Sequence, residues 1–185
     1  DPTWMREFEY ENYKNGNTID WYDYCTRTGL MQNYSASVSG ATEKINYYLS
    51  GTYTDQQGVV KGDDYDRTAL TARLQSDITD WLQLGGQVNY TYNDYSGASV
   101  YDLYQAIRLS PYGRAERADG GGLEKFPCNE GIYRINPMWN VESGTIDDHD
   151  TYATTSMKGH VLVKCPWVEG LTYRLNGSYS VENIE

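Results

Sequence analysis

The sequence is poor in phenylalanine, in long apolar runs and in basic residues. Only 2 Phe occur in 185 residues. No apolar run reaches about 18 residues, which excludes a transmembrane helix but not a membrane strand of about 9 to 11 alternating residues. The 15 Lys and Arg are outnumbered by 26 Asp and Glu, and the net charge is −11. Nucleic acid is therefore not an expected partner, because phosphate recognition requires clustered cations.

The sequence is instead rich in amphipathic aromatic residues. It contains 19 Tyr, 5 Trp and 18 Gly, and its mean hydropathy is −0.72. Tyr and Trp are favoured where one end of a ring is apolar and the other is hydrated, as at membrane interfaces and binding surfaces. Trp81 and Trp167 fall at predicted turns, where they fit an interfacial aromatic girdle.

Residues that could support catalysis or metal binding are few and scattered. The cysteines Cys25, Cys128 and Cys165 form no Cys-x-x-Cys motif, so a zinc site is not expected. They are either isolated residues or, in an oxidising compartment, include a Cys128–Cys165 disulfide. His149 and His160 have no Cys or Ser partner at a recognisable spacing, and the acidic run around His149 is interpreted as a solvated loop tip. We therefore predict no cofactor, no metal and no enzymatic activity.

The strongest pattern is an alternation of apolar and wettable residues, which predicts β-strands. It occurs in six runs, at residues 31–39, 44–54, 66–78, 81–93, 153–164 and 171–182. In the second run, Ile45, Tyr47 and Leu49 share one face, and the residues between them are wettable. Each predicted strand therefore has one apolar face and one polar face.

Charged side chains of these strands are predicted to lie on the polar face alone. They are Arg67, Arg73, Asp77, Lys158, Lys164 and Arg174. A charge facing hydrocarbon at the midplane of a barrel costs roughly 2 to 4 kcal/mol, so membrane strands exclude charges from the lipid side. The inner face of a soluble β-sandwich excludes them too, so alternation alone fits both architectures.

The lengths of the connections favour a membrane barrel. Outer-membrane barrels alternate short periplasmic turns with long extracellular loops. Here the short connections are residues 40–43, 79–80 and 165–170, and the long ones are residues 55–65 and about 94–152. A loop as long as residues 94–152 is rare in a compact soluble domain, where connections have a median length of about 4 to 6 residues.

An ordered series of motifs resembles the SusC/RagA family of TonB-linked outer-membrane proteins. Within residues 15–95 the motifs include Asp20-Trp21, Arg27-Thr28-Gly29, Ser37-Val38-Ser39-Gly40, Gly58-Val59-Val60-Lys61-Gly62, Ala72-Arg73-Leu74 and Asp80-Trp81-Leu82. Farther along the chain the resemblance continues in Ser110-Pro111-Tyr112, Asn136-Pro137 and Gly170-Leu171-Thr172-Tyr173. It covers nearly the whole chain, and the long loop matches least. Cys25 departs from it, because the family usually has an apolar or aromatic residue there.

The resemblance implies a wide, plugged barrel of about 22 strands in the bacterial outer membrane, which imports large nutrients such as glycans or peptides. The implied partners are TonB, acting through the plug, a SusD-like surface lipoprotein, the remainder of the barrel, and outer-membrane lipid. The first residues, DPTWMREFEY, do not form a signal peptide. We expect a signal sequence, the plug, its TonB box and further strands to lie outside this chain.

Candidate substrate contacts fall in two places. Exposed aromatic rings can stack on sugars, which makes Tyr112, Tyr133 and Trp139 of the long loop candidates; the alternative is that these rings pack the loop against itself. On the polar strand face the candidates are Arg73, Arg174 and His160, which would face the lumen or the plug.

The predicted fold is all-β, with antiparallel up-and-down strands that form part of a transmembrane β-barrel. Residues 1–30 would lead into the barrel, residues 31–94 would form four strands with short periplasmic turns and one extracellular loop, residues 95–152 a long extracellular loop, and residues 153–185 two further strands. The alternative is a soluble carbohydrate-binding β-sandwich, in which the alternation would form a core.

Overall fold

A computed structural model describes residues 4–95, 97, 100, 103–129, 134–142 and 149–184. Within them the chain divides into two compact units. Unit 1 comprises Asp1–Leu30, Gln57–Asp64 and Ser96–Asp148, and unit 2 comprises the remaining segments, Met31–Gln56, Tyr65–Tyr95 and His149–Glu185. Among the described residues, no helix has both the length and the apolar character needed to cross a membrane.

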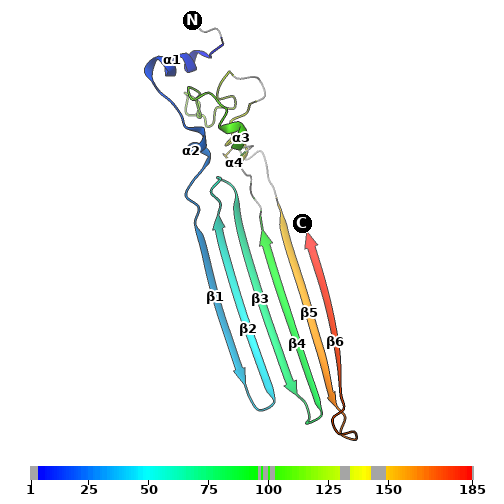
Figure 1. Ribbon diagram of the computed structural model, residues 1–185. Coiled ribbons are helices and arrows are strands. Elements are labelled where there is room, and N and C mark those ends of the chain that lie inside the picture. The colour runs from blue at the N-terminus through cyan, green and yellow to red at the C-terminus, as the bar shows by residue number, and fades with distance from the viewer. Residues whose placement is uncertain are drawn as a thin grey trace. The chain divides into compact units, whose positions relative to one another are not determined.

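Unit 2 contains one antiparallel sheet of six strands in sequence order (Figure 1). The strands are β1 (Met31–Ala41), β2 (Ile45–Gln57), β3 (Asp64–Asp77), β4 (Leu82–Asp94), β5 (Thr151–Lys164) and β6 (Thr172–Ile184). Each strand pairs with its neighbours along the chain, so the sheet is an up-and-down meander. The predicted all-β fold is confirmed, and the sheet forms part of a transmembrane β-barrel.

Most strands are longer than the alternation predicts, and they extend mainly towards the long connections. In β2, for example, backbone pairing continues beyond residue 54 to Asp55 opposite Gln32 and Gln56 opposite Met31. Backbone hydrogen bonding does not require an apolar side chain, so a ladder can continue after the apolar pattern stops. The strand ends therefore depend on pairing as well as on side-chain pattern.

Side-chain hydroxyls close two of the short turns. In the turn between β1 and β2, the Thr42 hydroxyl accepts hydrogen bonds from the backbone N–H groups of Lys44 and Ile45, at 3.3 and 3.0 Å. In the turn between β3 and β4, the Thr79 hydroxyl accepts from the Leu82 N–H at 3.0 Å. Threonine stabilises turns by such local bonds, which satisfy backbone donors that the ladder leaves open.

Unit 1 contains four short helices that the sequence pattern does not predict. They are α1 (Glu7–Asn15), α2 (Trp21–Cys25), α3 (Leu103–Ala106) and α4 (Trp139–Glu142). Asp20 caps α2, because its carboxylate accepts from the N–H groups of Tyr22 and Asp23 at 2.9 and 3.1 Å. Gly16 ends α1 in the left-handed conformation, with a φ of 69°.

The buried core of the described residues lies entirely in unit 1. Its apolar members are Trp21, Cys25, Val100, Ala106, Leu109, Ala115, Cys128 and Met138. The Trp21 indole donates to the Ser110 carbonyl oxygen at 2.8 Å. The amide of Asn136, which has no exposed surface, donates to the carbonyl oxygens of Ala115 and Glu124 at 2.8 and 3.1 Å. These bonds satisfy polar atoms that would otherwise be costly to bury.

Candidate functional site

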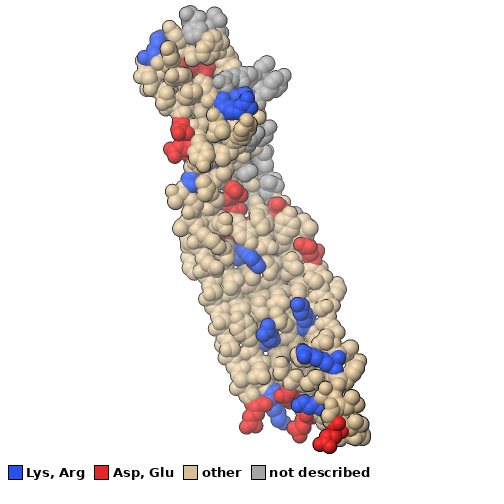
Figure 2. Space-filling model, in the orientation of Figure 1, with Lys and Arg blue, Asp and Glu red and all other residues tan. Residues whose placement is uncertain are grey.

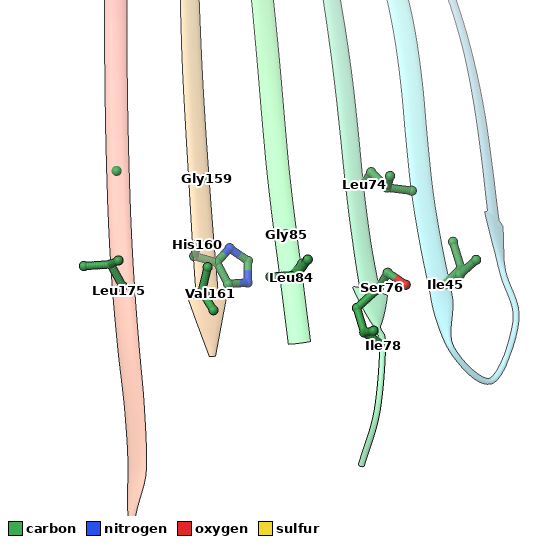
Figure 3. A pocket seen from close by; sticks show the side chains of 11 residues that line it. Ile45, Leu74, Ser76, Ile78, Leu84, Gly85, Gly159, His160, Val161 and Leu175 are labelled. Carbon is green, nitrogen blue, oxygen red and sulfur yellow. The ribbon is translucent and has the colours of Figure 1, made fainter. Parts of the chain in front are cut away.

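The two faces of the sheet differ in chemistry along its whole described length. None of the described strand side chains is buried. On the apolar face, register places Ser76, Leu84, Val161 and Leu175 opposite one another in successive strands. The next row of that face is Leu74, Gly86, Gly159 and Gly177. An open apolar hollow of about 680 Å³ follows this part of the face (Figure 3).

Tyrosines and then aspartates bound the apolar face at the end where the long connections begin. Tyr34 pairs with Tyr53, and Tyr92 is the last residue on this face before Asp94, which ends β4. Beyond these rings, Asp66 pairs with Asp94. The order from the middle of the sheet outwards is therefore aliphatic, then aromatic, then acidic.

The prediction that no charged residue shares the apolar face is wrong at this end. Asp55, Asp66 and Asp94 have the same strand parity as the apolar residues. They lie beyond the tyrosines, and the Asp66 carboxylate accepts from the Tyr53 hydroxyl at 3.0 Å. The face is free of charge from Leu82 to Tyr92, where a hydrated boundary begins.

Hydrogen bonds between side chains connect neighbouring strands on the polar face. The Thr71 hydroxyl of β3 donates to the Asn89 side-chain oxygen of β4 at 3.2 Å, and Gln87, also on β4, donates its amide to the same oxygen at 2.9 Å. Nearer the short turns, the Gln83 amide donates to the Asp77 carboxylate at 2.7 Å. Amide and hydroxyl groups therefore make this face wettable and partly ordered.

Arg73, Arg174 and His160, the strand candidates, all lie on the polar face. Lys158, which the sequence analysis placed on this face but did not name as a contact, pairs with Gln87, and Gln87 pairs with Arg73. His160 pairs with Gly85 and Asn176. All four basic side chains line one hollow of about 390 Å³. Figure 2 shows several Lys and Arg side chains gathered over this part of the sheet.

Gly85 is fitted to the His160 ring. A Cβ added at position 85 would lie far inside contact distance of Cε1 of His160. The imidazole therefore occupies the space that any larger residue at position 85 would need. Glycine in a strand often marks such a close approach.

The three aromatic candidates of the long loop have different environments. Tyr112 makes an edge-to-face contact with Tyr13, at 5.3 Å between ring centroids, and therefore packs the loop. Tyr133 lies outside the described residues. Trp139 is half-buried and lines a hollow of about 590 Å³. The Lys125 ammonium lies 5.4 Å from the centroid of the Trp139 ring.

Charged side chains surround the Trp139 hollow. Arg114 forms an ion pair with Glu124 at 2.8 Å, and Arg117 forms one with Asp119 at 2.7 Å. The backbone N–H of Gly121, together with Arg117, lowers the pKa of the Asp119 carboxyl. An aromatic ring bordered by charged hydrogen-bonding groups is a surface on which a sugar can stack and be oriented.

No group of three or more His, Cys, Asp and Glu side chains in the described ranges could hold a metal ion. Asp147 and Asp148, of the acidic run, lie outside those ranges. Cys25 and Cys128 are buried, and Cys165 is half-buried. Burial raises the pKa of the Cys25 thiol to about 11, and Lys61 opposes this shift.

Sequence comparison finds similarity to TonB-dependent receptors. No protein-family model matches it. TonB-dependent receptor P3 of Formosa agariphila is 26% identical over 196 residues, which cover 97% of this chain and 18% of the receptor. TonB-dependent receptor P26 of the same bacterium is 32% identical over 126 residues, which cover 68% of the chain and 12% of the receptor. The chain is a relative of the TonB-dependent receptors.

A further receptor of that bacterium extends the similarity. TonB-dependent receptor P39 is 22% identical over 166 residues, which cover 89% of the chain and 15% of the receptor. The chain thus spans less than a fifth of the length of the TonB-dependent receptors that it matches. Similarity to these receptors agrees with a single sheet that has one apolar and one polar face.

Proposed function

We propose that the chain is part of the barrel wall of a TonB-dependent importer in the bacterial outer membrane. In this proposal the apolar face of β1–β6 contacts lipid and the polar face lines the lumen or touches the plug. The short turns lie on the periplasmic side, and the segments 55–65 and 95–152 lie on the extracellular side. Residues 1–30 lead into the first of the strands.

The height of the charge-free apolar band is the observation that carries this proposal. From Leu82 to Tyr92, β4 covers about 34 Å at about 3.4 Å per residue. A tilt of roughly 40° reduces this length to about 26 Å across the membrane. Outer-membrane barrels have an apolar band about 25 Å tall, bordered by aromatic residues. The tyrosines at one end, and Trp81 and Trp167 near the short turns, fit these borders.

The soluble sandwich has weaker support. A sandwich requires a second sheet packed on the apolar face, at a spacing of about 10 Å. The described residues contain one sheet, and large apolar side chains such as Leu74 and Leu175 stay more than half exposed on it. Lipid would cover such a surface without a second sheet.

We further propose that the cargo is a large nutrient, a glycan or a peptide, and that a SusD-like surface lipoprotein helps to capture it. TonB would act through a plug. Within this chain the candidate contacts are Trp139 in the loop hollow, together with Tyr112 and Tyr133, and Arg73, Arg174 and His160 on the wall. The resemblance of the strand motifs to SusC/RagA proteins and the open loop hollow support this reading.

Membrane extraction and uptake of the full-length protein test the proposal. We expect the protein to fractionate with outer membranes, to require detergent for solubility, and to lose uptake of its nutrient when TonB is deleted. A monodisperse protein in plain buffer would contradict the membrane assignment. Uptake that persists without TonB would contradict the energy coupling while leaving the wall assignment intact.

A further inference from the structure

Three basic side chains lie close together on the polar face without an ion-pair partner among the described residues. We name Arg73, Lys158 and Arg174, with His160 between them, the wall patch. All four line the same hollow. Arg73 and Lys158 lie in one row, separated only by Gln87 on β4, so their backbones are about 10 Å apart. The ion pairs found within the described ranges involve Arg27, Arg114 and Arg117 instead.

Neutral amides hold both guanidinium groups of the wall patch. Nε and an Nη of Arg73 donate to the Gln87 side-chain oxygen at 3.2 and 3.0 Å. Nε of Arg174 donates to the Asn176 side-chain oxygen at 3.1 Å. An amide oxygen orients a guanidinium but leaves its charge uncompensated, and each Arg retains further N–H donors. The patch is therefore oriented and still cationic.

The charge of the patch contrasts with that of its surroundings. The chain carries a net charge of −11, yet the described carboxylates of the polar face lie away from the hollow. Asp77 is three strands from Arg174 in the same row, or about 14 Å, and accepts from Gln83. Glu182 pairs with Thr154, near the opposite end of β5. A local positive field on an acidic protein attracts anions.

The hollow also contains uncharged hydrogen-bonding groups. Gln75, Asn176 and Ser178 line it together with the basic residues. Its volume of about 390 Å³ lies within the range of about 300 to 1,000 Å³ that is usual for small-ligand sites. Guanidinium groups recognise oxyanions through paired N–H donors, and amides and hydroxyls recognise sugar hydroxyls.

From these observations we infer that the wall patch binds saccharides that carry carboxylates. The inference rests on the proposed function, because it requires the polar face to line the path of the imported nutrient. In this arrangement the Arg73 and Arg174 guanidinium groups and the Lys158 ammonium bind the carboxylates of the sugar chain, and the neighbouring amides bind its hydroxyls. An acidic segment of the plug is the competing occupant, and the experiment distinguishes the two.

The test compares full-length protein in detergent with its R73Q/K158Q/R174Q variant. The probes are a short oligogalacturonate and an uncharged oligosaccharide of the same length, measured by calorimetry at low and moderate salt. We expect the variant to bind oligogalacturonate roughly a hundredfold more weakly. This corresponds to about a tenfold loss for each of two of the substitutions and a smaller loss for the third. Binding of the parent protein should also weaken as salt rises.

The matched control is Arg67→Gln. Arg67 lies on the same face of β3 but nearer its opposite end, where it pairs with Asn93 outside the hollow. This variant removes one positive charge from the wall and should leave oligogalacturonate binding within about twofold of the parent. An equal loss in both variants would show a diffuse charge effect and would overturn the site.

The remaining outcomes separate this inference from the proposed function. If the parent protein is membrane-embedded and TonB-dependent but binds both oligosaccharides equally in parent and triple variant, the inference is wrong and the importer stands. If the triple variant releases the plug to protease while oligogalacturonate binding is unchanged, the patch holds the plug and the saccharide site is excluded. A protein that stays soluble without detergent would overturn the proposed importer function, on which this inference rests.

Discussion

The two units of the chain differ in whether they bury their apolar side chains. Unit 1 buries its apolar side chains, with Trp21 only 3% exposed and Asn136 satisfied by carbonyl oxygens at its centre. Unit 2 buries none of its described strand side chains, and Leu74 remains 54% exposed. A water-soluble domain cannot leave so many large apolar residues uncovered without association. The exposed apolar face of unit 2 therefore agrees with the proposal that it contacts lipid, whereas unit 1 has its own buried core.

The largest expected effect is in unit 1. Trp21→Ala removes a buried ring and leaves the Ser110 carbonyl oxygen without its 2.8 Å partner. We expect a loss of about 3–5 kcal/mol in the stability of this unit. Limited proteolysis of the full-length protein should show cleavage within residues 103–129 at a lower denaturant concentration than in the parent. The β-strand signal in circular dichroism should stay unchanged.

The adjacent Tyr22 provides the control for that change. Tyr22 is 52% exposed, so Tyr22→Ala removes an aromatic ring without opening a cavity. Its effect should be small, within about 0.5 kcal/mol. Equal protease sensitivity in both variants would indicate that α2 does not anchor a buried core.

A smaller effect is expected on the apolar face of the sheet. Leu74→Arg places a charge near the middle of the proposed lipid band and should cost roughly 2 to 4 kcal/mol in a lipid-reconstituted unfolding equilibrium. Gln75→Arg, one residue along β3, places the same charge on the polar face. That variant should be close to neutral, and a reversed order would mean that the faces are assigned the wrong way round.

The cap of α2 makes a contribution of about 1 kcal/mol. Asp20→Ala removes the acceptor for the Tyr22 and Asp23 N–H groups and should lower the stability of unit 1 by about that amount. Asp20→Asn keeps a side-chain oxygen in place and should recover most of the loss. Failure of the asparagine variant to recover stability would assign the effect to charge instead of capping.

The smallest effect is the pH dependence at Cys25. Burial raises the pKa of this thiol from 9.0 to about 11. Because the folded pKa lies above the unfolded one, the contribution to stability is complete below about pH 9 and is lost as pH rises towards about 11. Iodoacetamide should therefore label the half-buried Cys165 before Cys25 at pH 8. Faster labelling of Cys25 would contradict its burial.

Period-two alternation predicted the sheet well, because successive residues of a strand lie on opposite faces of the sheet and these faces differ in polarity. All six strands were found near their predicted positions, and the up-and-down order follows from the turns. Alternation could not predict the outer strand ends, where β3 begins at Asp64 and β4 continues to Asp94. Charges are tolerated there because hydrated groups lie beyond the tyrosines.

Unit 1 was not predictable in the same way. Its helices have four to nine residues, too short to show a helical period, and only the local signals of Asp20 and Gly16 mark two of their ends. Its core joins segments from both sides of the first four strands, as the Trp21 to Ser110 bond illustrates. Such contacts depend on the folded chain and leave no periodic signal.

The candidate site was predicted in part. Strand parity placed Arg73, Arg174 and His160 on one face, but only register shows that Lys158 shares their hollow. In the loop, sequence alone could not separate Tyr112, which packs on Tyr13, from Trp139, which lines a hollow. Their roles in binding remain predictions.

The most direct test of the lipid-facing assignment is a spin-label scan of β4 from residue 82 to residue 92. The labels are placed one at a time in the full-length protein, reconstituted in lipid, with its native cysteines replaced. The apolar-face positions, such as Leu84 and Val88, should be accessible to oxygen, and alternate positions such as Gln83 and Asn89 to a water-soluble nickel complex. Oxygen accessibility without a period of two, or highest at Gln83 and Asn89, would contradict a lipid-facing wall.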